Sequence, residues 1–186
     1  MIELKPDLVR LIVEIAGREF PAAPPLLIAA QVWVESKGDA GAVSPAGAIG
    51  LMQIMPSTVM RRFSPFQLFD PETNLQVGVR YLREQFEHFP EIPDFRDRLS
   101  FALAAYNGGR GWINAALAAA REACGEPRHL SAGPRPGVWQ RWDVVGPYLF
   151  SVQDPSGRHP DANQIVSYVA RVWSAFQQLV SAGTGR

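Results

Sequence analysis

The 186-residue sequence predicts an all-α fold, built as a single domain over residues 1–186. Apolar residues recur at spacings of three and four along most of the chain, which is the period of a buried helix face. No set of alternating strands and no internal repeat accompanies them. The composition is 47% hydrophobic and 19% charged, which is typical of a globular protein rather than a disordered one.

The first part of the chain predicts two helices and a short third one. The first helix has an apolar stripe at helical spacing, formed by Leu8, Leu11, Ile12 and Ile15. Pro24 and Pro25 open the second helix, because proline suits a first helical turn. Residues 26–34 are apolar nearly all round, which is typical of a buried helix. Pro56 is expected to begin a short helix that runs through Phe63.

The central part predicts three longer helices. Asp70-Pro71 resembles a helix cap followed by a first-turn proline. The helix after it has the clearest amphipathic stripe of the chain, formed by Leu75, Val79, Leu82, Phe86 and Phe89. A further helix includes residues 99–106 and ends at Gly108-Gly109, and an alanine-rich helix follows over residues 113–123.

The last third combines loops with a final helix. Glycine and proline concentrate in residues 125–137, and a second turn is predicted at residues 154–157. The last helix has an inward stripe of Ile165, Val169, Trp173, Phe176 and Val180. The tail, residues 181–186, is expected to fray. A small hairpin near residues 42–49 stays open as an addition to the helical fold.

Charge and cysteine usage exclude several classes of function. Lys+Arg and Asp+Glu number 18 each, so nothing resembles the basic footprint of a nucleic-acid-binding protein. No run of about 18 apolar residues is present, so no membrane span or stable membrane insertion is expected. Cys124 is the only cysteine, which excludes an intramolecular disulfide and a multi-cysteine metal site. The three histidines are too scattered for a metal site and are expected at the surface: His88, His129 and His159.

Glu35 stands where the buried second helix ends. Burial and the negative end of the helix dipole both disfavour an ionised carboxylate, so the pKa of Glu35 is expected to be raised. A carboxylic acid that stays protonated near neutral pH suits a general acid. A glutamate at a helix end is more often a solvated surface residue, so position alone does not decide between these interpretations.

The segment after Glu35 favours a ligand site. Four glycines and four alanines lie within residues 38–50, and a loop with so little side-chain bulk lets the backbone approach a ligand closely. Gln53 lies between Met52 and Ile54 and is predicted to be partly buried. A buried amide needs hydrogen-bond partners. A sugar or the loop backbone would supply them equally well.

Four motifs resemble the SLT-type lytic transglycosylases of bacteria and phages, which belong to glycoside hydrolase family 23. The first two are Glu35-Ser36 and the run from Ser44 to Thr58, SPAGAIGLMQIMPST. The others are AAYNGG over residues 104–109 and Tyr168-Val169, with a matching helix over residues 74–82. The resemblance covers about residues 24–176. It departs from the family pattern at Gln164, where an acidic residue is usual, and over residues 111–161, which show no match.

The resemblance implies a lysozyme-like helical fold and a reaction. Peptidoglycan would be cleaved at its MurNAc-β-1,4-GlcNAc bond, with a 1,6-anhydro product and without a metal or other cofactor. Glu35 would act as the general acid and base. Ser44 would bind the N-acetyl group, Gln53 and Asn107 sugar polar groups, and Tyr106 and Tyr168 would flank the acid, while Met52 would line the pocket.

Several alternatives remain at the level of single residues. Met52 and Tyr168 fit core packing as well as sugar contact, and the same holds more strongly for Trp139 and Trp142. Asn107 also fits a left-handed residue that ends a helix before Gly108.

Other functions remain open as well. A muramidase of the goose-type lysozyme kind would use water, with Asp39 as second carboxylate. A non-catalytic glycan-binding or virion component would need no buried acid, and a helical protein-binding domain would need an exposed apolar patch.

Peptidoglycan glycan strands are therefore the expected partner of a chain that we expect to be monomeric. The N-terminal sequence is not typical of a signal peptide. This favours a phage lysin or a virion-associated enzyme that reaches the cell wall, or the periplasm, by lysis or virion delivery. An enzyme of a bacterial envelope-spanning secretion system is the second interpretation.

Overall fold

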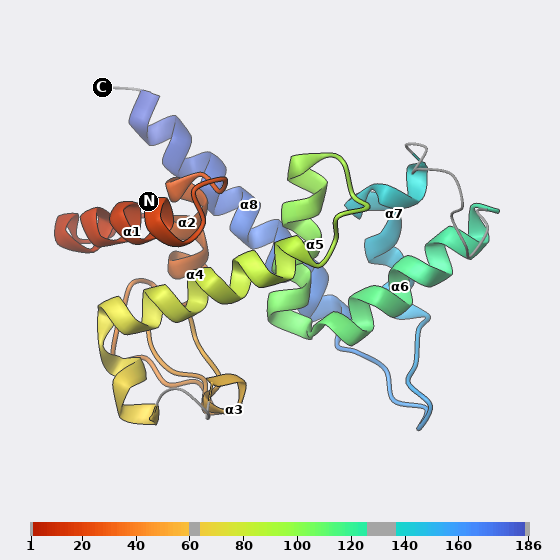
Figure 1. The fold of residues 1–186 in the computed structure, drawn as a ribbon, viewed down its shortest axis with the longest axis horizontal. Helices are drawn as coiled ribbons and strands as arrows, with labels where there is room; N and C mark the ends of the chain where they lie inside the picture. The colour runs from red at the N-terminus through yellow and green to blue at the C-terminus, as the bar shows by residue number, and fades with distance from the viewer. Residues whose placement is uncertain (1, 60–63, 126–136, 185–186) are drawn as a thin grey trace. The chain divides into compact units, whose positions relative to one another are not determined.

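The structure, a computed structural model, describes residues 2–59, 64–125 and 137–184 (Figure 1). Within these ranges the regular elements are all helices, which confirms the predicted all-α fold. Their bounds are α1 Pro6–Glu19, α2 Pro25–Ser36, α3 Pro56–Val59, η1 Pro65–Phe69, α4 Pro71–Glu87, α5 Phe95–Gly108, α6 Arg110–Ala123, η2 Val138–Gln140, α7 Trp142–Val145, η3 Gly146–Phe150 and α8 Ala162–Thr184. In the described ranges each helix is too short or too polar to cross a bilayer.

The chain packs as two compact units. The first contains residues 1–83 and 170–186, and the second contains residues 84–169. The helices α4 and α8 each contribute to both units. A single domain over residues 1–186 stays a prediction, and each unit is described by itself.

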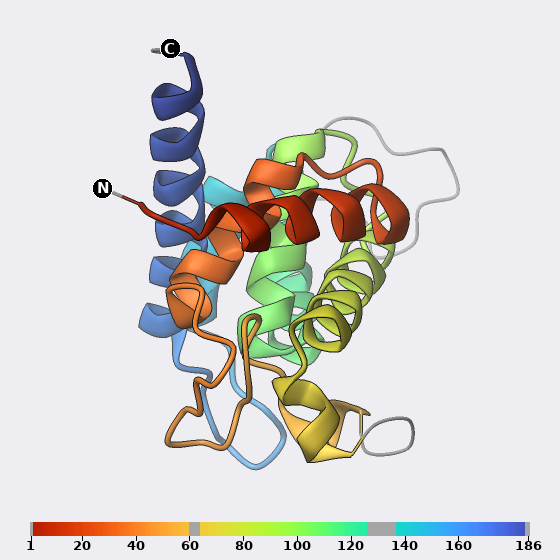
Figure 2. The ribbon, with the colours of Figure 1, turned by 90° about the vertical axis from the view of Figure 1, so that its left-hand side faces the viewer.

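The first unit is built on the buried helix α2. Residues 27–32 of α2 are buried, as its apolar sequence predicted. The amphipathic helix α1 packs against α2 (Figure 2), and its residues Ile12, Ile15 and Ala16 are buried. The core side chains of this unit include Ile12, Ile15, Leu27, Ile28, Leu51, Met52, Leu75, Val79 and Leu82.

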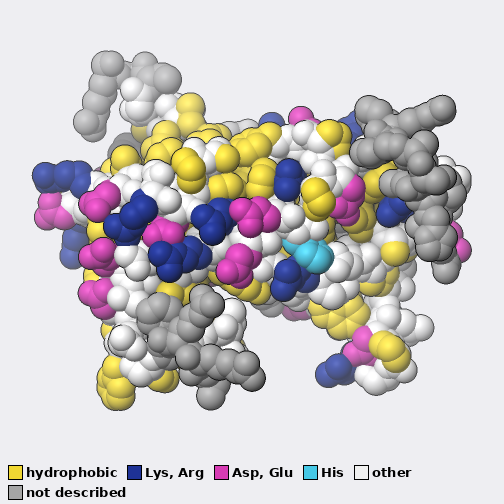
Figure 3. Space-filling model, in the orientation of Figure 1, with side chains coloured by type: hydrophobic (Ala, Val, Ile, Leu, Met, Phe, Trp, Pro, Cys, Tyr) yellow, Lys and Arg dark blue, Asp and Glu magenta, His cyan; other side chains and the backbone are white. Residues whose placement is uncertain are grey.

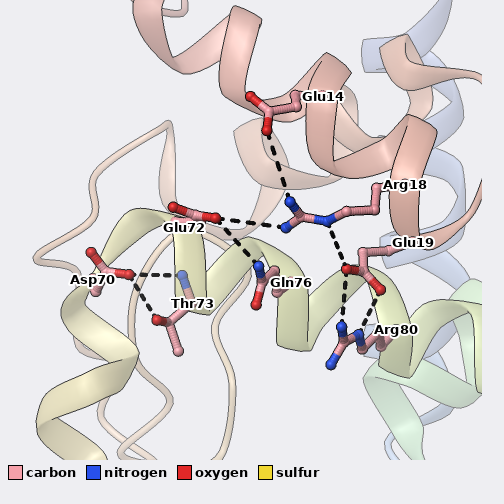
Figure 4. Close-up of polar contacts among 8 residues, drawn as sticks. All are labelled: Glu14, Arg18, Glu19, Asp70, Glu72, Thr73, Gln76 and Arg80. Atoms are coloured by element: carbon pink, nitrogen blue, oxygen red, sulfur yellow. Dashed lines mark hydrogen bonds and ion pairs between the residues drawn. The ribbon is translucent and has the colours of Figure 1, made fainter.

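A polar network joins α1 to α4 at the edge of this core (Figure 4). The Glu19 side chain is only 7% exposed, and its carboxylate accepts hydrogen bonds from Arg80 Nε at 2.6 Å and Nη2 at 3.0 Å. Arg18 Nε donates to the same carboxylate at 3.1 Å, and Arg83 donates to the Glu19 carbonyl oxygen at 2.8 Å. The hydrogen bond from Arg80 is the main reason why the pKa of Glu19 is lowered despite burial.

The start of α4 is capped as its sequence predicted. Asp70 Oδ2 accepts hydrogen bonds from the Thr73 backbone N–H at 2.8 Å and from Thr73 Oγ1 at 2.7 Å. These bonds lower the pKa of Asp70. On the face that carries α1 and α4, acidic and basic side chains are interspersed rather than gathered by sign (Figure 3).

The second unit places α5 against α6 and the short helices of residues 138–150. Trp139 is 1% exposed, and the Arg121 guanidinium lies 4.5 Å from its ring centroid. Trp142 packs edge-on against Phe101, with 5.5 Å between the ring centroids. Core packing of Trp139 is therefore confirmed. The sequence did not predict η2, α7 and η3, because helices this short carry no readable period.

Several predicted boundaries change. Helix α8 runs to Thr184, and its buried face includes Val172 and Ala175, whereas Val180 is 37% exposed. The predicted stripe was wrong at Val180: a 3.6-residue period keeps position 180 on the side of 165 and 169, but residues 180–183 at this end of α8 are exposed. The turn at 154–157 is confirmed by a Gly157 N–H to Asp154 O bond of 2.9 Å. The predicted end of the short helix at Phe63, most of the 125–137 loop and His129 lie outside the described residues.

Candidate active site

Glu35 is the second-last residue of α2, and its side chain is partly exposed. The helix ends directly after it, because Lys37 adopts a left-handed conformation with φ 58° and its N–H bonds to Trp33 O at 3.1 Å. The Lys37 ammonium lies 4.9 Å from the Trp33 ring centroid. The acid is thus placed at the carboxyl end of a buried helix, as predicted. Its raised pKa stays a prediction.

The next residue, Ser36, is buried and bonds to a distant part of the loop. Its Oγ lies 2.9 Å from Leu51 O and 3.2 Å from Val32 O. The same oxygen accepts the Gly38 N–H at 3.2 Å. The end of the acid-bearing helix is therefore hydrogen-bonded to residue 51, far along the glycine-rich loop.

The loop itself is held by short-range backbone bonds. Isolated bridges pair Val43 with Ile49 and Ile49 with Ile54. Residues 49–54, which we call the 49–54 turn, reverse through Ile49 N–H to Ile54 O at 3.0 Å and Ile54 N–H to Ile49 O at 2.9 Å. The hairpin left open near residues 42–49 is present only as these bridges in the described part of the chain, without paired strands.

Ser44 lies in a tight turn of this loop. Its backbone N–H bonds to Ala48 O at 2.9 Å, and its Oγ accepts the Ala48 N–H at 3.0 Å. Since Oγ serves there as an acceptor, its hydroxyl hydrogen is left to donate to a ligand. That polarity suits the acetamido oxygen of a sugar.

Gln53 is partly buried, as predicted, and has a left-handed backbone with φ 49°. Its Nε2 donates to Gly50 O at 3.0 Å and to Ala42 O at 3.3 Å. The amide nitrogen therefore bonds the loop backbone, which was one of the two interpretations. The carbonyl oxygen Oε1 is the part of this amide that is left to accept a hydrogen bond from a ligand.

Met52 is fully buried against α4. A Cβ added at Gly78 would overlap the Met52 side chain, so glycine allows the methionine to lie directly on the helix. The Met52 backbone N–H donates to Asn74 Oδ1 at 2.8 Å. Core packing of Met52 is what the structure shows.

The second unit contains the other predicted residues. Tyr106 and Asn107 lie in the last turn of α5, which ends at Gly108 and is followed by Gly109 with φ 90°. Lys37 and Gln53 are the non-glycine residues with positive φ in the described ranges, so the left-handed alternative for Asn107 is wrong. Asn107 is instead part of the helix.

Helix α8 brings the fourth motif to this turn. Gln164 Nε2 lies 3.4 Å from Asn107 Oδ1, at the long end for a hydrogen bond. Tyr168, one turn further along α8, is 1% exposed. Gln164, where the sequence departs from the family pattern, therefore lies beside Asn107, a predicted sugar-binding residue. The sequence did not predict this proximity.

The predicted site residues fall into two groups, one in each unit. Glu35, Ser44, Met52 and Gln53 belong to the first unit, and Tyr106, Asn107 and Tyr168 belong to the second. Asp39, the candidate second carboxylate, is exposed, and its Oδ1 accepts the Gly41 N–H at 2.8 Å. In the described ranges no three His, Cys, Asp or Glu side chains gather as metal ligands.

The Transglycosylase SLT domain family matches residues 14–127 of this sequence, a range that contains Glu35, the glycine-rich loop and the end of α5. The chain belongs to this family. The predicted family is therefore confirmed, while the fourth motif, Tyr168-Val169, lies outside the matched range.

Named relatives extend the match. The chain is 33% identical over 156 residues to membrane-bound lytic murein transglycosylase F of Desulfosudis oleivorans, covering 82% of this chain and 32% of that protein. It is 39% identical over 107 residues to the soluble lytic murein transglycosylase of Escherichia coli, covering 53% of this chain and 15% of that protein. The SLT domain thus spans about a third or less of these relatives.

Solved structures show the same fold. The 70 kDa soluble lytic transglycosylase of Escherichia coli aligns with a TM-score of 0.62 at 24% identity, over 88% of this chain and 23% of that one. An inactive mutant of the lytic transglycosylase Slt of Pseudomonas aeruginosa aligns with a TM-score of 0.58 at 23% identity, over 93% and 24%. The predicted lysozyme-like helical fold is confirmed.

Proposed function

We propose that this SLT domain is a peptidoglycan lytic transglycosylase that cleaves the MurNAc-β-1,4-GlcNAc bond and leaves a 1,6-anhydroMurNAc end. One observation carries the proposal. Glu35 ends a buried helix whose next residue, Ser36, bonds to the loop that presents the Ser44 hydroxyl and the Gln53 carbonyl oxygen. Relatives named lytic murein transglycosylases support the same assignment.

The reaction needs one carboxyl group that first gives and then takes a proton. Glu35 protonates the glycosidic oxygen as the bond from that oxygen to C1 breaks. The acetamido oxygen of the same MurNAc stabilises the positive charge at C1. The Glu35 carboxylate then removes the proton from the C6 hydroxyl, and O6 bonds to C1. Glu35 regains its proton, and no water is consumed.

The remaining residues bind and enclose the sugar in this proposal. The Ser44 hydroxyl donates to the acetamido oxygen, and Gln53 Oε1 accepts from a sugar hydroxyl or N–H. Asn107 and Tyr106 contribute polar contacts from the end of α5. Met52 and Tyr168 are both buried, and in this proposal each contributes through packing within its own unit.

The setting is also proposed. The substrate is the glycan strand of the cell wall, and the protein acts as a monomer. Its place of action is the periplasmic wall, reached through phage lysis, virion delivery or other export, and an enzyme of a bacterial envelope-spanning secretion system is the second interpretation. The test of the chemistry does not depend on which of these routes applies.

The deciding experiment is mass spectrometry of the muropeptides released from purified sacculi. Glu35→Gln keeps the shape and removes the proton, so release should fall at least about a hundredfold while the helical circular dichroism is unchanged. Glu84→Gln, an exposed glutamate of α4, is the matched control and should retain wild-type activity.

The products distinguish the alternatives. Anhydro ends that disappear in Glu35→Gln establish the transglycosylase. Products one water heavier would make the protein a muramidase and direct attention to Asp39. Full activity of Glu35→Gln would refute the role of Glu35, and no product from the wild type would favour a glycan-binding component.

A further inference from the structure

Two buried backbone groups of the 49–54 turn bond to side chains outside the turn. Its internal bonds use the N–H groups of Ile49, Gln53 and Ile54. Leu51 and Met52 at its centre are 1% and 0% exposed, so the Leu51 carbonyl and the Met52 N–H need partners from outside the turn. Both partners are side chains.

Asn74 of α4 supplies the larger share of these bonds. Its Oδ1 accepts the Met52 N–H at 2.8 Å, and its Nδ2 donates to Ile49 O and Leu68 O, each at 2.8 Å. The residue is 0% exposed, and both of its amide hydrogens are used. Aspartate would lose both donors, and a longer glutamine would displace the turn. The residue type and its length are thus both required.

Glycines allow the turn to lie this close to α4. Gly50 has φ 78°, and a Cβ there would lie 2.6 Å from Leu68 O and overlap the Asn74 amide. Gly78, one turn after Asn74, leaves room for the Met52 side chain in the same way. The turn is therefore fitted to the surface of α4 on two sides.

Ser36 holds the same turn from the side of the acid. Its Oγ is 2.9 Å from Leu51 O, the carbonyl of the peptide group whose N–H belongs to Met52. One peptide group is thus bonded by Ser36 of α2 through its oxygen and by Asn74 of α4 through its nitrogen. Glu35 precedes Ser36 in the chain, so this peptide group fixes the turn relative to the acid.

We propose that Asn74 is a positioning residue for catalysis, which sets the 49–54 turn against the end of α2, with Ser36 as its second support. The inference rests on the proposed transglycosylase function. Fixing the turn also fixes the proposed sugar-binding amide of Gln53, because Gln53 Nε2 donates to Gly50 O within the turn. The Gly50 N–H in turn donates to Ala42 O at 2.8 Å. Preorganised donors and acceptors act on the transition state without a cost for ordering them during the reaction.

The test compares Asn74→Ala with Val79→Ala. Val79 is a fully buried residue of the same helix, so its truncation weakens the core while the hydrogen bonds of Asn74 to the turn are kept. Both variants are checked for helical circular dichroism at the assay temperature. Turnover per folded molecule on sacculi and the ratio of anhydro to hydrated products are then measured, together with amide hydrogen exchange at Met52.

We expect Asn74→Ala to lose about a hundredfold in turnover, since misplacement by about 1 Å has that effect on preorganised sites. Its residual products should contain a larger hydrated share, because a displaced loop admits water beside C1. Met52 amide exchange should accelerate, while Val79→Ala retains wild-type product ratios and Met52 protection. A product ratio does not respond to the inactive fraction, so it separates positioning from simple destabilisation.

Turnover of Asn74→Ala equal to that of Val79→Ala would overturn the proposal, and so would a loss of rate with an unchanged product ratio. If Asn74→Ala does not fold, Ser36→Ala replaces it, with an expected tenfold loss and the same shift in products; wild-type behaviour of that variant would refute the proposal. A wild type that releases no product refutes the transglycosylase function instead. Met52 exchange then still tests whether Asn74 holds the turn.

Discussion

Replacing Glu19 by glutamine tests the polar network that joins α1 to α4. The substitution keeps the size of a side chain that is 7% exposed and removes its charge. Three hydrogen bonds that Arg18 and Arg80 donate to the Glu19 carboxylate would then have a neutral amide as acceptor, or would be lost. Breaking a fully buried ion pair costs about 3–5 kcal/mol, whereas a surface pair contributes about 0–1 kcal/mol.

The expected loss lies between these limits. Arg80 and Arg18 are 49% and 44% exposed, so water replaces much of what they lose. We expect the free energy of unfolding at pH 7 to fall by about 2 kcal/mol, and Tm by about 4–8 °C for a chain of this length.

The pH dependence of this loss has a definite sign. The pKa of Glu19 is lower in the folded protein than its ordinary value of 4.5. Its ionised form therefore stabilises the fold above about pH 4.5, and this contribution disappears as pH falls through the lowered folded-state pKa. The difference between wild type and Glu19→Gln should be full at pH 7 and should narrow as the pH is lowered below 4.5.

Urea unfolding followed by circular dichroism, at pH 7 and at a series of acidic pH values, measures this difference. Asp7→Asn is the control, because Asp7 and Arg10 form an ion pair between side chains that are 93% and 78% exposed. It should change stability little at any pH. Equal stability of Glu19→Gln and wild type at pH 7, or a difference that is undiminished in acid, would refute the reasoning.

Two further predictions concern the turn and its helix. Gly50→Ala should lower the free energy of unfolding by about 2–4 kcal/mol, because the new Cβ overlaps Asn74 and the Leu68 carbonyl at a left-handed φ of 78°; thermal unfolding measures this, and wild-type Tm would contradict it. Asp70→Ala should cost about 1 kcal/mol at pH 7 through the lost bonds to Thr73. The pKa of Asp70 is lowered in the folded protein, so the stability difference between wild type and Asp70→Ala should also narrow in acid. Urea unfolding at several pH values measures it, and a difference that does not change with pH would contradict the prediction.

The long helices were predictable because their pattern repeats. All five residues of the predicted stripe are buried, although Phe89 lies beyond the end of α4 at Glu87, and Asp70 caps the helix as its sequence indicated. The helices between residues 138 and 150 were not predictable, since two turns or fewer cannot establish a period. The exposed Val180 shows the same limit at a helix end, where periodicity continues after the packing partners have ended.

The candidate site was predictable where a residue acts through its own chemistry. The sequence predicted that Glu35 lies at the end of an apolar helix and that a loop of small residues follows it. The role of Asn74 was not, because an asparagine inside an amphipathic pattern looks the same whether it faces water or distant backbone groups. The signal that existed was a poor helix former next to Leu75 in the buried stripe. The left-handed backbone of Gln53 also depends on contacts that a local pattern does not contain.

The bond between Ser36 and Leu51 has a consequence for variation in this loop. The hydrogen bond from Ser36 Oγ to Leu51 O, 2.9 Å long, joins the two residues that flank residues 37–50. Residues 37–50 therefore form an excursion that is closed at its base. Pro45 and Ala46 at its outer end are exposed. Insertions or exchanges at this outer end alter the exposed surface of the loop, while the Ser36–Leu51 bond at its base stays in place. This freedom is confined to the tip of the excursion, because Ser44 belongs to the proposed sugar-binding groups and the Ala42 carbonyl accepts a hydrogen bond from Gln53.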